Sequence, residues 1–166
     1  MRNIFTLMLF ILTNCANAQI PVLQAENSFG GSDNEHAFSI QQTEDAGFIA
    51  AGSTRSNDGQ VQGNHTVGEP DFWVLKLNKT GGIQWQKSLG GSNDETAFCV
   101  QQTKDGGYIV AGEANSRDGQ VTGNHGVLDM WVVKLDGNGT SFGRNRSVEV
   151  KMILQTACSK QKMEAI

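Results

Sequence analysis

The sequence predicts an all-β protein built from repeated, antiparallel sheets of four strands. Its strongest feature is internal repetition, because the run from Gly30 to His65 returns from Gly90 to His125, 60 residues later and without a gap. The stretch that begins at Asp71 returns at Asp129, 58 residues later. Near-identical units at a fixed period are the signature of repeat architectures. Helical spacing of apolar residues is absent after the N-terminal segment.

Short stretches of alternating apolar residues define the strands. In "DFWVLKLN", Trp73, Leu75 and Leu77 share one face, which is the pattern of a half-buried strand. The linking sequence "KDGG" supplies turn chemistry, because glycine adopts positive backbone dihedrals at little steric cost. Within the repeat, the predicted strands are 72–77, 83–89, 96–103 and 108–112.

Four antiparallel strands in about 60 residues, repeated in tandem, are typical of the blades of a β-propeller. Closed propellers have about 4 to 8 blades, and this chain contains about two. "LQAENSF" from Leu23 occupies the slot of "IQWQKSL" from Ile83, so the exported chain is expected to open on a blade's second strand. A partial propeller leaves edges and faces exposed, which predicts aggregation or degradation of the lone product.

The first 18 residues have the layout of a secretory signal peptide. A single cation at Arg2 precedes an apolar run from Ile4 to Leu12, and small residues at Ala16 and Ala18 precede Gln19. The run is too short to span a bilayer. We expect cleavage after Ala18 and a secreted or cell-surface product. The alternative is a lipoprotein anchored through Cys15, for which Asn14 is a poor preceding residue.

Charge and cysteine content bound the function further. Residues 19–140 hold 15 acidic and 7 basic residues, whereas residues 141–166 hold 2 and 5. An acidic body argues against nucleic acid as a partner, because phosphates require a basic surface. After signal cleavage only Cys99 and Cys158 remain, so no disulfide framework is predicted.

The tail, residues 141–166, shares no pattern with the repeats, and we interpret it as an out-of-frame reading. If the frame shifted near Ser141, the codons of Met163 and Glu164 join to give Gly, as the repeat requires. Joining the codons of Phe142 and Gly143 permits Trp, 58 positions after Trp85. The rest of the tail then permits the repeat without a gap. A genuine linker or C-terminal helix is the alternative.

The segments "GGSNDETAFCVQQTKDGGYIVAG" and "DGQVTGNHGVLDMWVVKL" resemble the blades of secreted tandem-repeat propeller proteins of Bacteroidetes-type bacteria. Nearly all of residues 20–140 is covered by this resemblance. It implies kinship with the quinoprotein-dehydrogenase-like propeller superfamily. Many such proteins end in a type IX secretion sorting domain, and this chain shows none, which a frameshift would explain.

Polar residues recur in two equivalent loops, each ending just before a tryptophan strand. The repeat-signature residues are Asn64, His65 and Asp71 in the first repeat and Asn124, His125 and Asp129 in the second. Asp58 and Asp118 are candidate calcium ligands, because carboxylates are hard oxygen donors. The favoured alternative is that these aspartates cap turns and the histidines pack against a neighbouring blade.

A catalytic centre is not apparent. Glu35 and Glu95 invite comparison with the two acids of a glycosidase. Their spacing, however, follows from the repeat alone. Trp73, Trp85 and Trp131 could stack on sugar rings, although alternating strand positions favour a core role.

The sequence thus favours an exported, non-enzymatic scaffold or binding module whose partner is a glycan or a protein at the cell surface. No catalytic or cofactor-binding residue is assigned, and calcium is the one cofactor considered. The alternative is a fragment of a secreted carbohydrate-active, endoglucanase-like or quinoprotein-like enzyme that lacks its active site.

Overall fold

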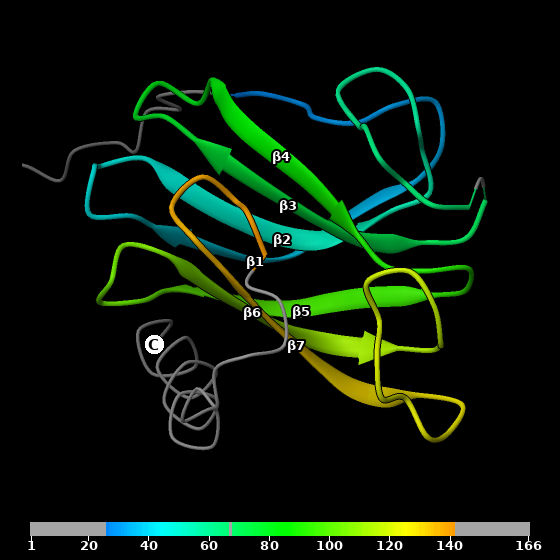
Figure 1. Cartoon of the computed structure of the whole chain (residues 1–166). Helices are drawn as coiled ribbons and strands as arrows, with labels where there is room; N and C mark the ends of the chain where they lie inside the picture. Colours follow the sequence, from blue (N-terminus) through cyan, green and yellow to red (C-terminus); the bar gives the residue numbers. More distant parts are fainter. Residues whose placement is uncertain (1–25, 67, 142–166) are drawn as a thin grey trace, which may run out of the picture.

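The computed structural model describes residues 26–66 and 68–141, and this part of the chain is all-β without a helix (Figure 1). It forms two antiparallel sheets in which strands follow one another in chain order. Sheet A has the order β1-β2-β3-β4, and sheet B has the order β5-β6-β7. The strands are β1 (Glu35–Gln42), β2 (Phe48–Thr54), β3 (Asp71–Leu77), β4 (Ile83–Leu89), β5 (Glu95–Gln102), β6 (Tyr108–Ala114) and β7 (Asp129–Leu135). The predicted signal peptide, residues 1–18, and the tail after Ser141 lie outside the described residues.

All four predicted strands are present, with ends shifted by at most two residues. Strand β5 stops at Gln102 because the Thr103 N–H donates to the Gly107 carbonyl and so opens the turn. The pairing of β5 with β6 repeats that of β1 with β2 position by position. Both pairs carry an irregularity at the same place, between Ala37 and Ser39 and between Ala97 and Cys99.

The prediction that the mature chain opens on a strand is wrong for its described part. Residues 26–29 form no strand, whereas Leu23 and the two residues after it lie outside the described range. Strand β4, which has the equivalent sequence, is held by hydrogen bonds to β3. Among the described residues, 26–29 have no preceding strand of that kind, so their backbone lacks a ladder to join there.

Strand β3 differs from the half-buried strand that its alternation predicts, because all seven of its residues are buried. Phe72 and Val74 pack in a core shared with sheet B, whereas Trp73, Leu75 and Leu77 pack in a second cluster on the opposite face. Alternate side chains of β3 therefore face two different apolar clusters, and both sets of side chains are buried. Lys76 is also buried, where its Nζ lies 2.8 Å from Asp45 Oδ2 and donates to the Leu77 carbonyl.

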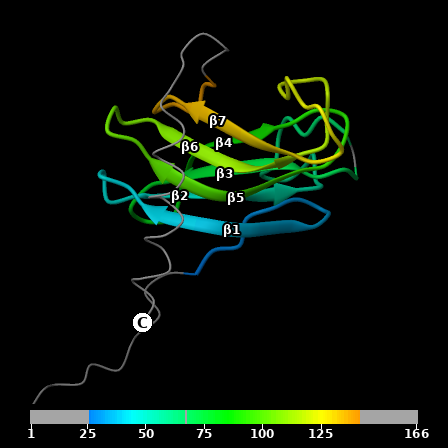
Figure 2. The ribbon, with the colours of Figure 1, turned by 90° about the horizontal axis from the view of Figure 1, so that it is seen from below.

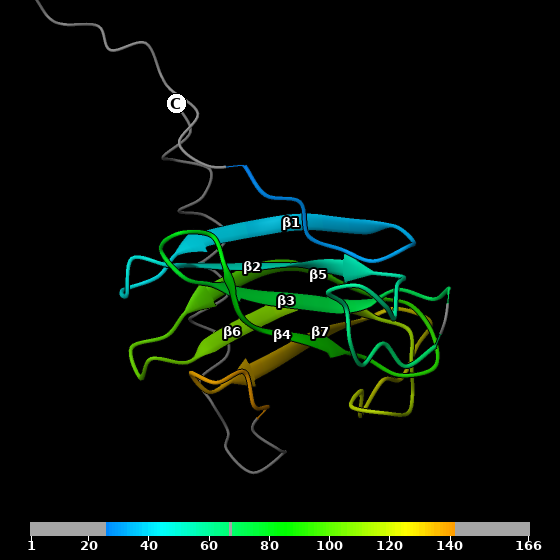
Figure 3. The ribbon, with the colours of Figure 1, turned by 90° about the horizontal axis from the view of Figure 1, so that it is seen from above.

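The two sheets pack face to face, and β5 lies against β1 and β2 (Figure 2, Figure 3). Burial of this apolar surface is the main favourable contribution to packing. The buried residues of the shared core are Ile49, Ala51, Phe72, Val74 and Leu89 from sheet A and Ala97, Val100, Tyr108, Val110, Val133 and Leu135 from sheet B. Trp85 and Trp131 pack against this core.

The edge strands β1 and β5 are joined by side chains. The Val100 N–H donates to Ser39 Oγ at 3.2 Å, and the Gln102 N–H donates to Gln41 Oε1 at 2.7 Å. In return, Gln102 Oε1 accepts the Glu44 N–H at 2.9 Å. These bonds satisfy edge N–H groups that have no neighbouring strand on that side, and they set the register between the sheets.

Candidate functional site

Two long loops, between β2 and β3 and between β6 and β7, lie at the same end of the sheets and contain the repeat-signature residues (Figure 1). In the first loop Asn64 is buried, and its Nδ2 donates to the carbonyls of Thr54, Ser56 and Glu69 at 3.1–3.4 Å. In the second loop the Asn124 Nδ2 donates to the Ala114 carbonyl at 2.8 Å. Both asparagines therefore fasten their loop to the sheet that it leaves.

His65 and Asp71 form a close pair in the first loop. His65 Nδ1 lies 2.5 Å from Asp71 Oδ2, which also accepts the His65 backbone N–H at 3.0 Å. The Asp71 side chain is 1% exposed. Burial raises the pKa of the Asp71 carboxyl group, and the hydrogen bonds from His65 oppose that rise. This geometry holds the imidazole ring in one orientation.

The equivalent pair in the second loop is open. His125 Nδ1 lies 3.8 Å from Asp129 Oδ2, and the two side chains are 91% and 38% exposed. Only the backbone N–H of His125 is close to that carboxylate, at 2.6 Å. The difference follows from the neighbouring layer, because the segment leading into sheet B covers Asp71 and no described residue covers Asp129 in the same way.

Glu95 of sheet B is fully buried beside Asp71 of sheet A. A Cβ atom placed on Gly90 would lie 2.3 Å from Asp71 Oδ1 and 2.5 Å from Glu95 Oε2. Glu95 accepts the backbone N–H groups of Gly91 and Ser116, both at 2.9 Å, whereas Asp71 Oδ1 has no hydrogen-bond partner among the described atoms. Two carboxylates from successive sheets thus converge on one glycine.

Glu35 makes one corresponding bond in sheet A, because its carboxylate accepts the Gly31 N–H at 3.1 Å, and it also accepts the Thr54 hydroxyl at 2.8 Å. Each glutamate therefore bonds to its own sheet and the loop before it. The acid that converges with Glu95 on Gly90 is Asp71 and not Glu35. The sequence could not indicate that pairing, because it joins residues of different repeats across a sheet interface.

The calcium candidates Asp58 and Asp118 lie in equivalent places, one in each long loop. Asp58 Oδ1 accepts the Ser32 N–H and Asp118 Oδ1 accepts the Ser92 N–H, both at 2.8 Å. These hydrogen bonds lower the pKa of the Asp118 carboxyl group. Each aspartate ties its loop to the Gly-Gly-Ser segment before the sheet. Within residues 26–66 and 68–141, no three histidine, cysteine or acidic side chains gather as a possible metal site.

The three tryptophans contribute to packing. Trp73 is buried and its Nε1 donates to Gln86 Oε1 at 2.9 Å. Trp131 contacts Phe72 across the sheet interface, with ring centroids 4.7 Å apart. Trp85 contacts Tyr108, and its Nε1 donates to the Gly137 carbonyl at 3.1 Å.

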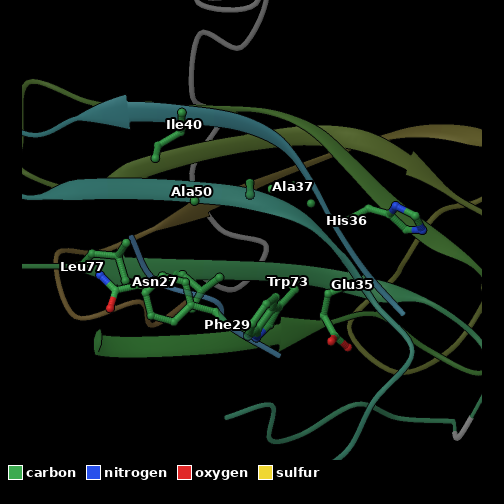
Figure 4. Close-up of a pocket in the computed structure, with 12 residues that line it drawn as sticks. Asn27, Phe29, Glu35, His36, Ala37, Ile40, Ala50, Trp73 and Leu77 are labelled. Carbon is green, nitrogen blue, oxygen red and sulfur yellow. The ribbon is translucent and has the colours of Figure 1, made fainter. Parts of the chain in front are cut away.

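An apolar pocket of about 340 Å³ opens on the face of sheet A that does not contact sheet B (Figure 4). Trp73, Leu75 and Leu77 form one wall, and Ile40 and Ala50 form another. Asn27 and Phe29, from the segment ahead of β1, also line it. Glu35 and His36 are the ionisable groups among its lining residues.

No known protein family matches the sequence, and no curated protein matches it at a significant level. The described residues also contain no helix that is long and apolar enough to cross a membrane. The polar groups of the repeated loops fasten these loops to the sheets, and the pocket is an open apolar surface on sheet A.

Proposed function

We propose that this chain is an exported, non-enzymatic β-propeller repeat module that acts as a scaffold or binding surface and is a truncated product. In this proposal sheets A and B are two neighbouring blades of a partial propeller. Three observations support it. The antiparallel strands of each sheet follow chain order, the two sheets pack face to face, and β1 pairs with β2 in the same register as β5 with β6. The expected partner is a glycan or a protein at the cell surface.

One observation carries the non-enzymatic assignment: the polar groups of the repeated loops bond to backbone groups of the same fold. Asn64, Asp58 and Glu95 all accept from or donate to main-chain atoms. An active site instead presents groups toward a reacting molecule. Bonds of this kind recur in both repeats, as a repeat architecture requires of its loops: the recurring pairs are those made by Asn64 and Asn124, by Asp58 and Asp118, and by Glu35 and Glu95.

The test measures glycan binding and hydrolysis on the same purified chain. We expect binding to a glycan array or to a surface protein, without release of new reducing ends from soluble polysaccharides. The matched control is Glu35→Gln, which alters the partly buried acid at the pocket. Hydrolysis that disappears in Glu35→Gln would overturn the proposal and favour the fragment of a carbohydrate-active enzyme.

Export and truncation have separate tests. N-terminal sequencing of the product recovered from a bacterial host is expected to begin at Gln19. A product that still contains Arg2, or that is lipidated at Cys15, contradicts cleavage after Ala18. For the tail, sequencing the gene is expected to show repeat-like coding in the other frame after the codon for Ser141. Absence of that coding contradicts the frameshift.

A further inference from the structure

The open face of sheet A carries apolar residues at the repeat positions that sheet B uses to pack on sheet A. Sheet B contributes Val100, Val110 and Val133 to the shared core. Their counterparts in sheet A, at the repeat distances of 60 and 58 residues, are Ile40, Ala50 and Leu75. All three line the pocket on the open face. The same relation holds for Ala97 and Ala37, Trp131 and Trp73, and Leu135 and Leu77.

The open face of sheet B carries the complementary set. Sheet A contributes Ile49, Ala51, Phe72 and Val74 to the shared core, and the counterparts of these residues in sheet B are Ile109, Ala111, Met130 and Val132. Trp73, Leu75, Leu77 and Ile109 on these faces are buried, but one position on each face is far more exposed than its counterpart in the shared core. Phe72 is 0% exposed, whereas its counterpart Met130 is 73% exposed, and Val100 is 4% exposed, whereas its counterpart Ile40 is 56% exposed.

Phe29 covers part of the open face of sheet A. Its counterpart is Leu89, the last residue of β4, which packs in the core between the sheets. Phe29 packs in the same relation against the open-face cluster of Trp73, Leu75 and Leu77. The segment ahead of β1 therefore already occupies the position of a preceding sheet's fourth strand, and the positions of three further strands lie beside it.

We propose that this face receives a second copy of the chain, head to tail, through the open face of its sheet B. Strands β5, β6 and β7 of the second copy are the three strands that the site lacks, and residues 26–29 take the place of the fourth. The contact would repeat the existing interface between the sheets. Met130 of the second copy would take the position of Phe72, and Asp129 would approach Glu35 as Asp71 approaches Glu95.

This contact is heterologous, since different surfaces of the two copies meet. Such contacts form rings when the rotation closes, and rings of about 4 to 8 blades correspond to two to four copies of two blades each. Self-assembly goes beyond the proposed scaffold role. Its test measures the mass of the particle in solution, whereas the test of the proposed function measures glycan binding and hydrolysis. Either proposal can therefore fail while the other stands.

The experiment uses two variants of the full chain, recovered after export, that each block one face. Ile40→Arg places a charge on the open face of sheet A, and Met130→Arg does so on sheet B. Both side chains are exposed, so both variants should retain the parent's circular dichroism and melting behaviour. Lys104→Glu, in an exposed turn, is the control for altered charge.

Analytical ultracentrifugation gives the outcome. The parent and Lys104→Glu are expected to form discrete assemblies, and each blocked variant is expected to be monomeric. Mixing Ile40→Arg with Met130→Arg leaves one intact pair of faces, so the mixture should sediment at twice the mass of either variant. A monomeric parent would overturn the proposal. A mixture of the two variants that stays monomeric would also overturn it. So would assembly that is lost in only one of the variants, because a symmetric dimer formed through a single face would give that result.

Discussion

The carboxylates of Asp71 and Glu95 converge on Gly90, although they belong to different sheets. Gly90 stands at the start of the connection from β4 to β5, where any Cβ atom would lie within 2.5 Å of both acids. The contact joins the end of the first long loop to the start of sheet B. The conformation of the loop, the burial of the two acids and the packing of the two sheets therefore all depend on the space at Gly90.

Gly90→Ala should destabilise the protein by about 1–3 kcal/mol, because the added methyl group overpacks a buried site whose neighbours are held by hydrogen bonds. Urea unfolding followed by tryptophan fluorescence measures the change. Gly126→Ala is the matched control, since its nearest neighbour would be Asp129 Oδ1 at 3.4 Å, an ordinary contact. Equal effects of the two substitutions would argue against crowding at Gly90.

The stability of the protein should depend on pH through Asp71. Its pKa is raised in the folded state, so protonation favours folding, and the benefit is lost as pH rises through that folded value. We expect the free energy of unfolding of the native chain, relative to Asp71→Asn, to increase as pH falls from neutrality toward the ordinary value of 3.8. Denaturant unfolding at several pH values measures this difference. A difference that stays constant, or that shrinks at low pH, would show that burial does not control this group.

Ala46→Gly should stabilise the turn between β1 and β2 by about 1 kcal/mol. Ala46 has φ of 62°, a left-handed conformation that costs a residue with a Cβ about 1–2 kcal/mol. The second repeat already has glycine there, Gly106, with φ of 78°. Gly106→Ala is the reciprocal variant and should destabilise by a similar amount. Thermal melts of both variants decide the matter, and changes of the same sign would contradict the explanation.

Asn64→Ala should cost about 1–3 kcal/mol and expose residues 55–66 to proteolysis, because three carbonyls, two of them buried, lose their donor. Asn124→Ala should cost less, since its amide donates to only the Ala114 carbonyl among the bonds described for it to other segments. Limited proteolysis with mass spectrometry locates the cleavage. Cleavage at the second loop alone in Asn64→Ala would contradict the assigned role.

Chelation should leave the melting temperature unchanged. Asp58 and Asp118 already accept backbone N–H groups, which explains their recurrence without a metal ion. Differential scanning fluorimetry with and without a chelator measures this directly. A lower melting temperature that calcium restores, and that Asp58→Asn abolishes, would assign calcium to the loops.

Much of the local structure was predictable because strand alternation and turn chemistry act over a few residues. The strand β4 begins at Ile83 and ends at Leu89, as its pattern predicts. Glycine-rich turns lie between paired strands, as at Gly106. The role of the asparagines in the loops was not predictable in detail, because their acceptors are carbonyls placed by the surrounding fold.

The sequence by itself determined the strands, their chain-order pairing and the equivalence of the two repeats, since these depend on periodicity and turn residues. Only the tertiary structure decided which face each strand covers and how deeply. Asp71 and Asp129 occupy equivalent positions in the sequence, yet one carboxylate is buried and the other is open to solvent. The physical reason is that burial depends on what packs from another sheet, and sheet B covers Asp71 while no described segment covers Asp129.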